Sequence, residues 1–227
     1  MTLPDTSNLL QRKRLSDQVM DLMLGAIRDG AYGPEDLITE PALAKRLGIS
    51  RTPVREALFR LVGNGVLEER GRGYCLPVLS EVEVGQMFHL RQLLEGDILR
   101  LIALNPPDLQ GLAALDDAAA AEQASAEMHA PAPFLAANTA FRRALFSLCA
   151  NRYLTAMADH CNDRLQAYRA ATLTDPATRR GVAAAHLSLC AALRVGDVAG
   201  AARRYLDQLD LANDAYARAS RPLAKLT

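Results

Sequence analysis

The sequence of 227 residues lacks features that mark several large classes of protein. It has no run of about 18–20 apolar residues, the length that a helix needs to cross a bilayer. Its start, MTLPDTSNLLQRKRL, lacks the apolar middle of a signal peptide. The four cysteines are scattered, and no two of them have the spacing of a metal knuckle or a redox motif. We therefore expect a cytoplasmic protein with no membrane partner and with reduced cysteines.

The sequence also lacks net charge, because 26 basic side chains balance 26 acidic ones. The distribution of charge is nevertheless uneven. Residues 45–72 contain seven basic and three acidic side chains, a local net charge of +4, so the rest of the chain sums to −4. A local basic patch on a neutral protein is the electrostatic pattern that a nucleic-acid-binding surface requires.

The spacing of apolar residues predicts three short helices in the first third of the chain, after a flexible leader at residues 1–14. The predicted helices cover residues 15–30, 40–47 and about 52–63. Thr52 followed by Pro53 resembles an N-cap followed by a proline in the first turn. Residues 66–78 predict two short strands around the tight turn Gly71-Arg72-Gly73. Residues 15–79 therefore predict a winged helix-turn-helix domain, with three helices and a β-hairpin wing.

The pattern changes at Ser80, which forms a capping box with Glu83 three residues later. Helices alone are predicted from there on, over residues 80–104, 108–128, 132–150, 151–170, 175–195 and 197–219. The alanine-rich part at 113–133 predicts a helix with little bulk to hold it in a core. The predicted fold class is mostly α, with an all-helical antiparallel bundle at 80–220 and a tail at 221–227.

Two arginines, Arg51 and Arg55, lie in or beside the first turn of the third predicted helix. The helix dipole disfavours cations there, and their spacing of four places them on one side of the helix. A recognition helix points this end into the major groove of DNA, where phosphates and guanine edges supply negative charge. The alternative is a helix with solvated arginines, such as Arg60 paired with Glu56. The combination of helix, turn, helix and basic wing favours DNA binding.

Other residues near these arginines suit contacts with DNA. Ser50 and Thr52 carry hydroxyls that can hydrogen-bond phosphate oxygens. At the predicted wing tip lie Arg72 and Gly73, where a glycine lets the backbone approach the minor groove or the phosphates.

The stretch LITEPALAKRLGISRTPVREALFRLVGNGVLEERGRGY resembles the DNA-binding domain of the GntR family of bacterial transcription regulators, most specifically in SRTPVREAL. The helical remainder resembles the C-terminal effector domain of the FadR subfamily, called FCD. The resemblance implies a homodimer on a short palindromic operator in double-stranded DNA, which a small metabolite releases or rearranges. The DNA-contacting positions that it implies are Ser50, Arg51, Thr52, Pro53, Arg55 and Gly73. Pro41 and Phe59 stand where basic residues are usual in relatives.

Polar side chains interrupt the apolar stripes of the predicted bundle helices. The five candidate ligand-binding residues are Arg91, Asn138, Arg142, His186 and Gln208. A buried polar group needs a partner, and all five can converge inside a bundle.

Many relatives in the resembling family bind a divalent metal in this domain, through an Asp, a His four residues later and two further His. The corresponding residues here are Asn138, Arg142, His186 and Gln208. Two amides, a guanidinium and one imidazole make a poor transition-metal site, because arginine has no acceptor at all. We therefore predict no metal and no other cofactor.

Two interpretations of this pocket remain open. In the first, Arg142 supplies the positive charge of the missing cation and, with Arg91, binds a small organic acid. In the second, Arg142 forms a buried ion pair with Glu95 or Asp97, and the pocket binds nothing.

The predicted function is a sequence-specific DNA-binding transcription regulator whose helical domain binds a small, anionic, carboxylate-bearing metabolite. The alternative is a constitutive DNA-binding regulator with a ligand-free helical dimerisation domain. An enzyme is not expected, because no Ser/His/Asp, Cys/His or paired-carboxylate arrangement is visible in the sequence.

Overall fold

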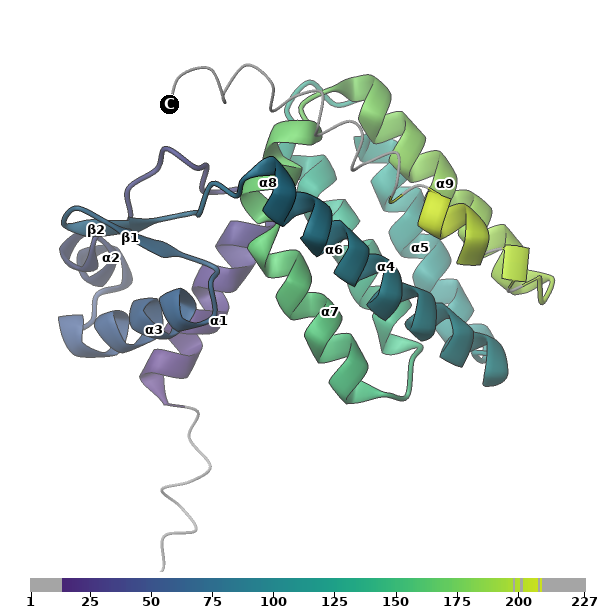
Figure 1. The fold of residues 1–227 in the computed structure, drawn as a ribbon, viewed down its shortest axis with the longest axis horizontal. Helices are drawn as coiled ribbons and strands as arrows, with labels where there is room; N and C mark the ends of the chain where they lie inside the picture. The colour runs from purple at the N-terminus through teal and green to yellow at the C-terminus, as the bar shows by residue number, and fades with distance from the viewer. Residues whose placement is uncertain (1–13, 198, 201, 208, 210–227) are drawn as a thin grey trace, which may run out of the picture. The chain divides into compact units, whose positions relative to one another are not determined.

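The computed structural model describes residues 14–197, 199–200, 202–207 and 209 (Figure 1). The chain divides into two compact units. The N-terminal unit comprises Met1–Ile27 and Tyr32–Pro77, and the C-terminal unit comprises Arg28–Ala31 and Val78–Thr227. The division thus falls just before the predicted domain boundary at 79/80. The last residue of the first helix and the three residues after it group with the C-terminal unit.

Three helices and a hairpin form the N-terminal unit, as the sequence predicts. The elements are α1 (Leu15–Arg28), α2 (Glu40–Leu47), α3 (Arg51–Gly63), β1 (Glu68–Arg70) and β2 (Gly73–Cys75). The two strands pair antiparallel, and Ile38 adds an isolated bridge to Tyr74. The apolar sides of the helices form the core, with Val19, Met23, Ile27, Leu43, Val54, Leu58 and Leu61 buried.

The turn between α2 and α3 differs in one detail from the prediction. Gly48 ends α2 with φ of +67°, a conformation that glycine adopts without strain. The N-cap of α3 is Ser50 rather than Thr52, so Thr52 and Pro53 lie inside the first turn. Proline is tolerated there because the amides of the first turn have no partner within the helix. The helix therefore begins one residue before Thr52, at Arg51.

Helices alone form the described part of the C-terminal unit. They are α4 (Glu81–Leu104), α5 (Leu109–Ser125), α6 (Ala132–Ser147), α7 (Arg152–Arg164), α8 (Gln166–Thr172) and α9 (Pro176–Arg194), with further helical residues at 199–200, 202–207 and 209. The predicted capping box of Ser80 and Glu83 is present at the start of α4. Most of the predicted helix at 197–219 and the tail at 221–227 lie outside the described residues.

The single helix predicted over 151–170 is wrong, because the chain breaks at Leu165 into α7 and α8. The Leu165 amide donates to the Asn162 carbonyl three residues back, which tightens the last turn of α7. The Leu165 side chain is fully buried in a cluster with Val84, Phe88 and Tyr168. The helix therefore breaks at the residue whose side chain is buried, and this break determines where α8 begins.

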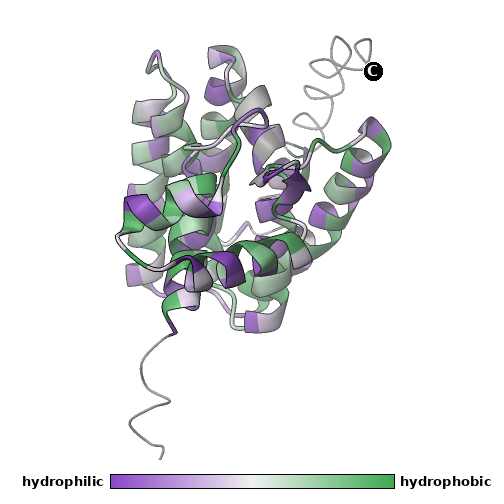
Figure 2. Cartoon of the chain, turned by 90° about the vertical axis from the view of Figure 1, so that its left-hand side faces the viewer, coloured by the Kyte–Doolittle hydropathy of each residue, from purple (hydrophilic) through white to green (hydrophobic). Residues whose placement is uncertain are grey.

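Hydrophobic and hydrophilic residues are mixed along the helices of the chain (Figure 2). The main core of the C-terminal unit includes Ile98, Leu99, Ile102, Leu115, Phe141, Leu145, Leu189 and Tyr205. The alanine-rich helix α5 packs against both α6 and α9, and Leu115 and Ala119 are buried in this core. The expectation of a weakly held helix is therefore wrong, because small side chains let neighbouring helices approach closely.

A fully buried arginine, Arg179, holds the end of α5 in place. Its guanidinium donates to the carbonyls of Ala126 (3.0 Å) and Met128 (2.8 Å), and to those of Leu173 and Thr174 (both 3.0 Å). These carbonyls lie at the C-terminal ends of α5 and α8, where unpaired acceptors and the helix dipole both attract a cation.

No helix in the described part of the chain is both long enough and apolar enough to span a membrane.

Candidate functional site

The N-terminal unit presents Arg51 and Arg55 on its surface, at the start of α3. Their side chains are 60% and 64% exposed, so neither guanidinium is enclosed by the protein. Val54 and Leu58 on the same helix are fully buried, which fixes the side of α3 that faces outward. Two cations are therefore displayed at a helix end that disfavours them, as a major-groove contact requires.

Both arginines bind one carboxylate, that of Glu40 at the start of α2. The Nε of Arg55 donates to Oε1 at 3.0 Å and its Nη2 donates to Oε2 at 3.1 Å. The Nη2 of Arg51 lies 3.4 Å from Oε2. Hydrogen bonding from Arg55 holds the pKa of Glu40 below its ordinary value. Glu40 was not among the residues predicted from the sequence.

The remaining residues predicted on this face fall into two groups. Ser50, Thr52 and Arg72 are exposed and Pro53 is half-buried, so these can border a DNA surface. Gly73 is buried as the first residue of β2, and a Cβ there would lie 2.7 Å from the Ile38 carbonyl. The turn at the wing tip thus comprises Gly71 and Arg72, and Gly73 already belongs to β2. Gly73 is required for close packing of the hairpin against Ile38.

The alternative pairing of Arg60 with Glu56 is also corrected. Arg60 binds Asp17 of α1 instead. This ion pair joins two helices of the N-terminal unit, whereas Arg51 and Arg55 face the surface beside the wing.

The C-terminal unit contains a cavity of about 40 Å³. Since one water needs about 10–15 Å³ of such space, it has room for a group the size of a carboxylate. Four of the five predicted ligand-binding residues line it: Arg91, Asn138, Arg142 and His186. The fifth, Gln208, lies outside the described residues. Sequence reasoning therefore identified half of the described polar lining residues and did not identify Tyr168, Arg169, Thr172 or Thr178.

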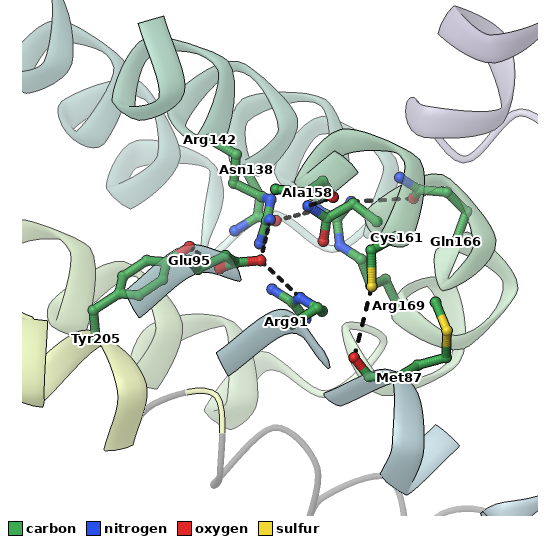
Figure 3. A network of polar contacts seen from close by, with 11 residues as sticks. Met87, Arg91, Glu95, Asn138, Arg142, Ala158, Cys161, Gln166, Arg169 and Tyr205 are labelled. Atoms are coloured by element: carbon green, nitrogen blue, oxygen red, sulfur yellow. Dashed lines mark hydrogen bonds and ion pairs between the residues drawn. The ribbon is translucent and has the colours of Figure 1, made fainter. Parts of the chain in front are cut away.

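Two of the predicted residues already have a counter-charge, in Glu95 (Figure 3). Arg91 Nε and Arg142 Nη2 both donate to Glu95 Oε1, at 2.9 Å and 2.6 Å, and the Tyr205 hydroxyl donates to Oε2 at 2.7 Å. Burial alone would raise the pKa of Glu95, but the charges of Arg142 and Arg91 outweigh it and lower the pKa to about 2. The ion pair with Glu95 that was one of the two alternatives for Arg142 is therefore present.

A second buried carboxylate, Glu122 of α5, was missed by sequence reasoning. It accepts a hydrogen bond from Asn138 Nδ2 at 2.5 Å, and its Oε2 lies 2.6 Å from His186 Nδ1. The His186 ring stacks on Phe141, with centroids 4.0 Å apart. Glu122 thus orients two of the predicted residues.

A third arginine of the cavity, Arg169 of α8, was also missed. Its Nη2 donates to Asn138 Oδ1, and its Nη1 donates to Gln166 Oε1 at 3.1 Å. Burial and the charges of Arg142 and Arg91 lower the pKa of Arg169 to about 9. No carboxylate among the described residues lies within ion-pair distance of Arg169. Arg91 and Arg142 share the single carboxylate of Glu95, so positive charge is in excess among the three guanidiniums of the cavity.

The described lining residues do not fit the divalent metal that the family resemblance implies for this domain. Arg142 has no lone pair to give, the Asn138 oxygen accepts from Arg169, and His186 Nδ1 is bound to Glu122. Within the described ranges, no group of three or more His, Cys, Asp or Glu is arranged to hold a metal ion.

The fold combines a winged helix-turn-helix unit with a separate helical unit, which is the architecture of a DNA-binding regulator. Comparison with known proteins agrees, since residues 15–75 match the family described as "Bacterial regulatory proteins, gntR family". Residues 86–210 match the FCD domain. The chain therefore belongs to the GntR family of bacterial transcription regulators with an FCD domain.

Individual relatives are similar over part of the chain. It is 28% identical over 141 residues to the uncharacterized HTH-type regulator YdhC of Bacillus subtilis, across 60% of this chain and 62% of that protein. It is 36% identical over 101 residues to the probable D-xylose utilization operon repressor of Paenarthrobacter nicotinovorans, across 44% of this chain and 45% of that protein. The matches thus span less than two thirds of these relatives.

A solved structure, Escherichia coli McbR/YncC, has the same fold. It superposes with a TM-score of 0.80 at 23% identity, over 91% of this chain and 99% of that one.

Proposed function

We propose that the C-terminal unit binds a small metabolite with one carboxylate group, and that binding alters the affinity of a homodimer for a palindromic operator. The supporting observation is the buried, uncompensated charge of Arg169. Of three guanidiniums that line the cavity, Arg91 and Arg142 share Glu95, and Glu122 is bound to His186 and Asn138. An isolated buried charge is costly, and one ligand carboxylate would offset it.

In this proposal the ligand carboxylate binds Arg169, with Arg91 and Arg142 adding positive potential from their bonds to Glu95. His186 has Nδ1 bound to Glu122, which leaves Nε2 for a ligand hydroxyl or carbonyl. Asn138 and Gln208, the latter outside the described residues, are the further polar positions. The sequence predicted that Arg142 binds the ligand carboxylate, whereas this proposal assigns that role to Arg169.

The DNA side of the proposal uses the exposed face of α3 and the wing. Ser50, Arg51, Thr52, Arg55 and Arg72 would contact DNA, while Pro53 and Gly73 shape the helix start and the hairpin. A palindromic site read by two copies requires a dimer, because half-site symmetry mirrors the symmetry of the protein. Such a regulator acts where the DNA is, in the cytoplasm.

A thermal-shift panel tests the ligand. It contains monocarboxylates, hydroxy acids, dicarboxylates, sugar acids and neutral sugars, since one relative is named for D-xylose utilization. We expect stabilisation by a monocarboxylate or sugar acid in the wild type and none in Arg169→Gln. The control is Arg180→Gln, whose arginine is exposed and pairs with Glu127 on the surface; it keeps the response.

The same panel, repeated as a gel shift on operator DNA, decides between the two candidate functions. A ligand that stabilises the protein and changes DNA affinity supports an effector-responsive regulator. The competing candidate, a constitutive regulator with a ligand-free bundle, is favoured by the ion pairs that Arg91 and Arg142 already form with Glu95. It would be established if no anion stabilised the wild type and DNA affinity stayed constant.

A further inference from the structure

The carboxylate of Glu40 lies in an unusual place for a DNA-binding surface, because it faces two cations that the phosphate backbone should attract. Only 14% of its side chain is exposed, against 60% and 64% for Arg51 and Arg55. The Tyr74 hydroxyl of β2 also lies 3.4 Å from its Oε1. Glu40 is therefore held between α3 and the wing, and it is fixed more firmly than the arginines that it binds.

The geometry of the contact leaves part of Arg55 available. Glu40 takes the side edge of the guanidinium, formed by Nε and Nη2. A guanidinium has five N–H donors in a rigid plane. One Nη1 hydrogen and the second Nη2 hydrogen therefore point away from Glu40, along the end of the side chain. That end can donate two hydrogen bonds to O6 and N7 of a guanine.

We propose that Glu40 is a positioning residue for base recognition, which locks the side edge of Arg55 so that its outer end meets a guanine in the major groove. A free arginine loses side-chain entropy when it binds a base, whereas one already held by a carboxylate loses less. A mobile arginine would also contact any nearby phosphate, which binds without reading sequence. Glu40 thereby raises the preference for the operator over other DNA. The inference rests on the proposed role of Arg55 in DNA binding.

The opposite role, in which Glu40 only repels DNA, predicts a different result. Loss of one negative charge near the DNA strengthens electrostatic binding to every sequence alike. A purely structural role predicts equal weakening for every sequence. A positioning role alone changes the ratio between operator and non-specific affinity.

The experiment measures that ratio for the full-length protein. The probes are a duplex selected by the wild type from a randomised library and a scrambled duplex of equal length, titrated by fluorescence anisotropy at fixed salt. The variants are Glu40→Gln, Arg55→Ala and, as a matched control, Glu69→Gln. Glu69 is an exposed carboxylate of β1, and it lines a surface cleft that Glu40 also lines. Its substitution by glutamine therefore removes the same amount of charge near the DNA face.

We expect the ratio to fall by about tenfold in Glu40→Gln and to stay unchanged in Glu69→Gln. Single base-pair substitutions in the selected duplex should show that Glu40→Gln and Arg55→Ala relax the preference at the same guanine. An unchanged ratio in Glu40→Gln, or relaxation at a different position, overturns the positioning role. If Arg55→Ala also leaves the ratio unchanged, the proposed role of Arg55 in DNA binding is wrong as well. The Arg55→Ala result therefore distinguishes failure of the positioning role of Glu40 from failure of the proposed DNA-binding surface.

Discussion

Arginine serves the two units of this protein in opposite environments. In the N-terminal unit, Arg51 and Arg55 are mostly exposed, and the carboxylate beside them lies on the same surface. In the C-terminal unit, Arg91, Arg142, Arg169 and Arg179 are buried. An exposed cation costs little to keep and remains available to a polyanion, whereas a buried one must find its partners inside the fold.

The buried arginines solve this problem in three ways. Arg91 and Arg142 share the carboxylate of Glu95, and Arg179 uses carbonyls at helix ends. Arg169 has only amide oxygens among its described hydrogen-bond acceptors. Among the buried arginines, Arg169 therefore differs from the other three, because its described partners are neither a carboxylate nor carbonyls at helix ends.

The largest effect on stability is expected when the buried carboxylate of Glu95 is removed. Glu95→Gln leaves two buried guanidiniums without their carboxylate and should lower the free energy of unfolding by about 3–5 kcal/mol. Urea denaturation measures it, with the exposed Glu127→Gln as control. A loss under 1 kcal/mol would contradict the assignment of Glu95 as the shared counter-ion.

The pH dependence of stability follows from the same residue. The folded-state pKa of Glu95, about 2, lies below its ordinary 4.5. Its contribution is therefore fully present above pH 4.5 and is lost as the pH falls toward 2. Glu95→Gln should remove that part of the acid dependence.

The second effect concerns Arg179, whose partners are carbonyls. Arg179→Met keeps most of the side-chain volume but leaves buried carbonyls of α5 and α8 without a donor. We expect a loss of about 2–4 kcal/mol in the free energy of unfolding. Hydrogen exchange should show the loosened segment around Ala126 and Leu173. Full protection there would show that the contacts contribute little.

Substitution of the two exposed arginines, Arg51 and Arg55, tests the role of arginine in the N-terminal unit. The double variant Arg51→Ala, Arg55→Ala should change the free energy of unfolding by less than about 0.5 kcal/mol. Its affinity for a selected duplex should fall by at least about tenfold. Arg60→Ala is the matched control, since Arg60 lies on the same helix but binds Asp17. Equal losses of DNA affinity in both would remove the special role of the pair.

Much of this fold could be predicted because its signals are local. The capping box at Ser80, the stop at Gly48 and the apolar spacing of α1 act within a few residues. The candidate polar residues were found because they interrupt apolar stripes. Glu95 was named as one of two possible partners of Arg142, but the partners of Asn138 and His186 were not found, because they depend on how helices pack.

Glu122 and Arg169 illustrate what local patterns miss. Glu122 lies in an alanine-rich segment that gives no strong apolar face, so its burial against α6 and α9 could not be predicted. Arg169 lies beyond the break at Leu165, and a continuous helix would have turned it in another direction. Both positions are set by tertiary packing, which overrides local preference.

A smaller effect is expected at Arg169 itself. Arg169→Met removes a buried charge that no described carboxylate compensates, so the free energy of unfolding should stay constant or rise by up to about 2 kcal/mol. The folded-state pKa of about 9 is depressed below the ordinary 12.5. The wild type therefore regains stability as the pH rises through 9, since its guanidinium then loses the proton that the unfolded chain keeps. The advantage of the variant should narrow above pH 9, and a constant difference would contradict the cause given for the shift.

The smallest effect, none at all, is expected from metal ions. Zn²⁺ or Ni²⁺ should leave the melting temperature of the wild type unchanged, because Arg142 offers no lone pair and Asn138 and His186 already bind other residues. The double variant Asn138→Asp, Arg142→His restores the residue types of metal-binding relatives beside His186, and it should gain a metal-dependent rise in melting temperature. A rise in the wild type at stoichiometric metal would show that the family site persists, with ligands other than those assigned. A rise in the double variant alone would show that one guanidinium is sufficient to exclude the metal from this bundle.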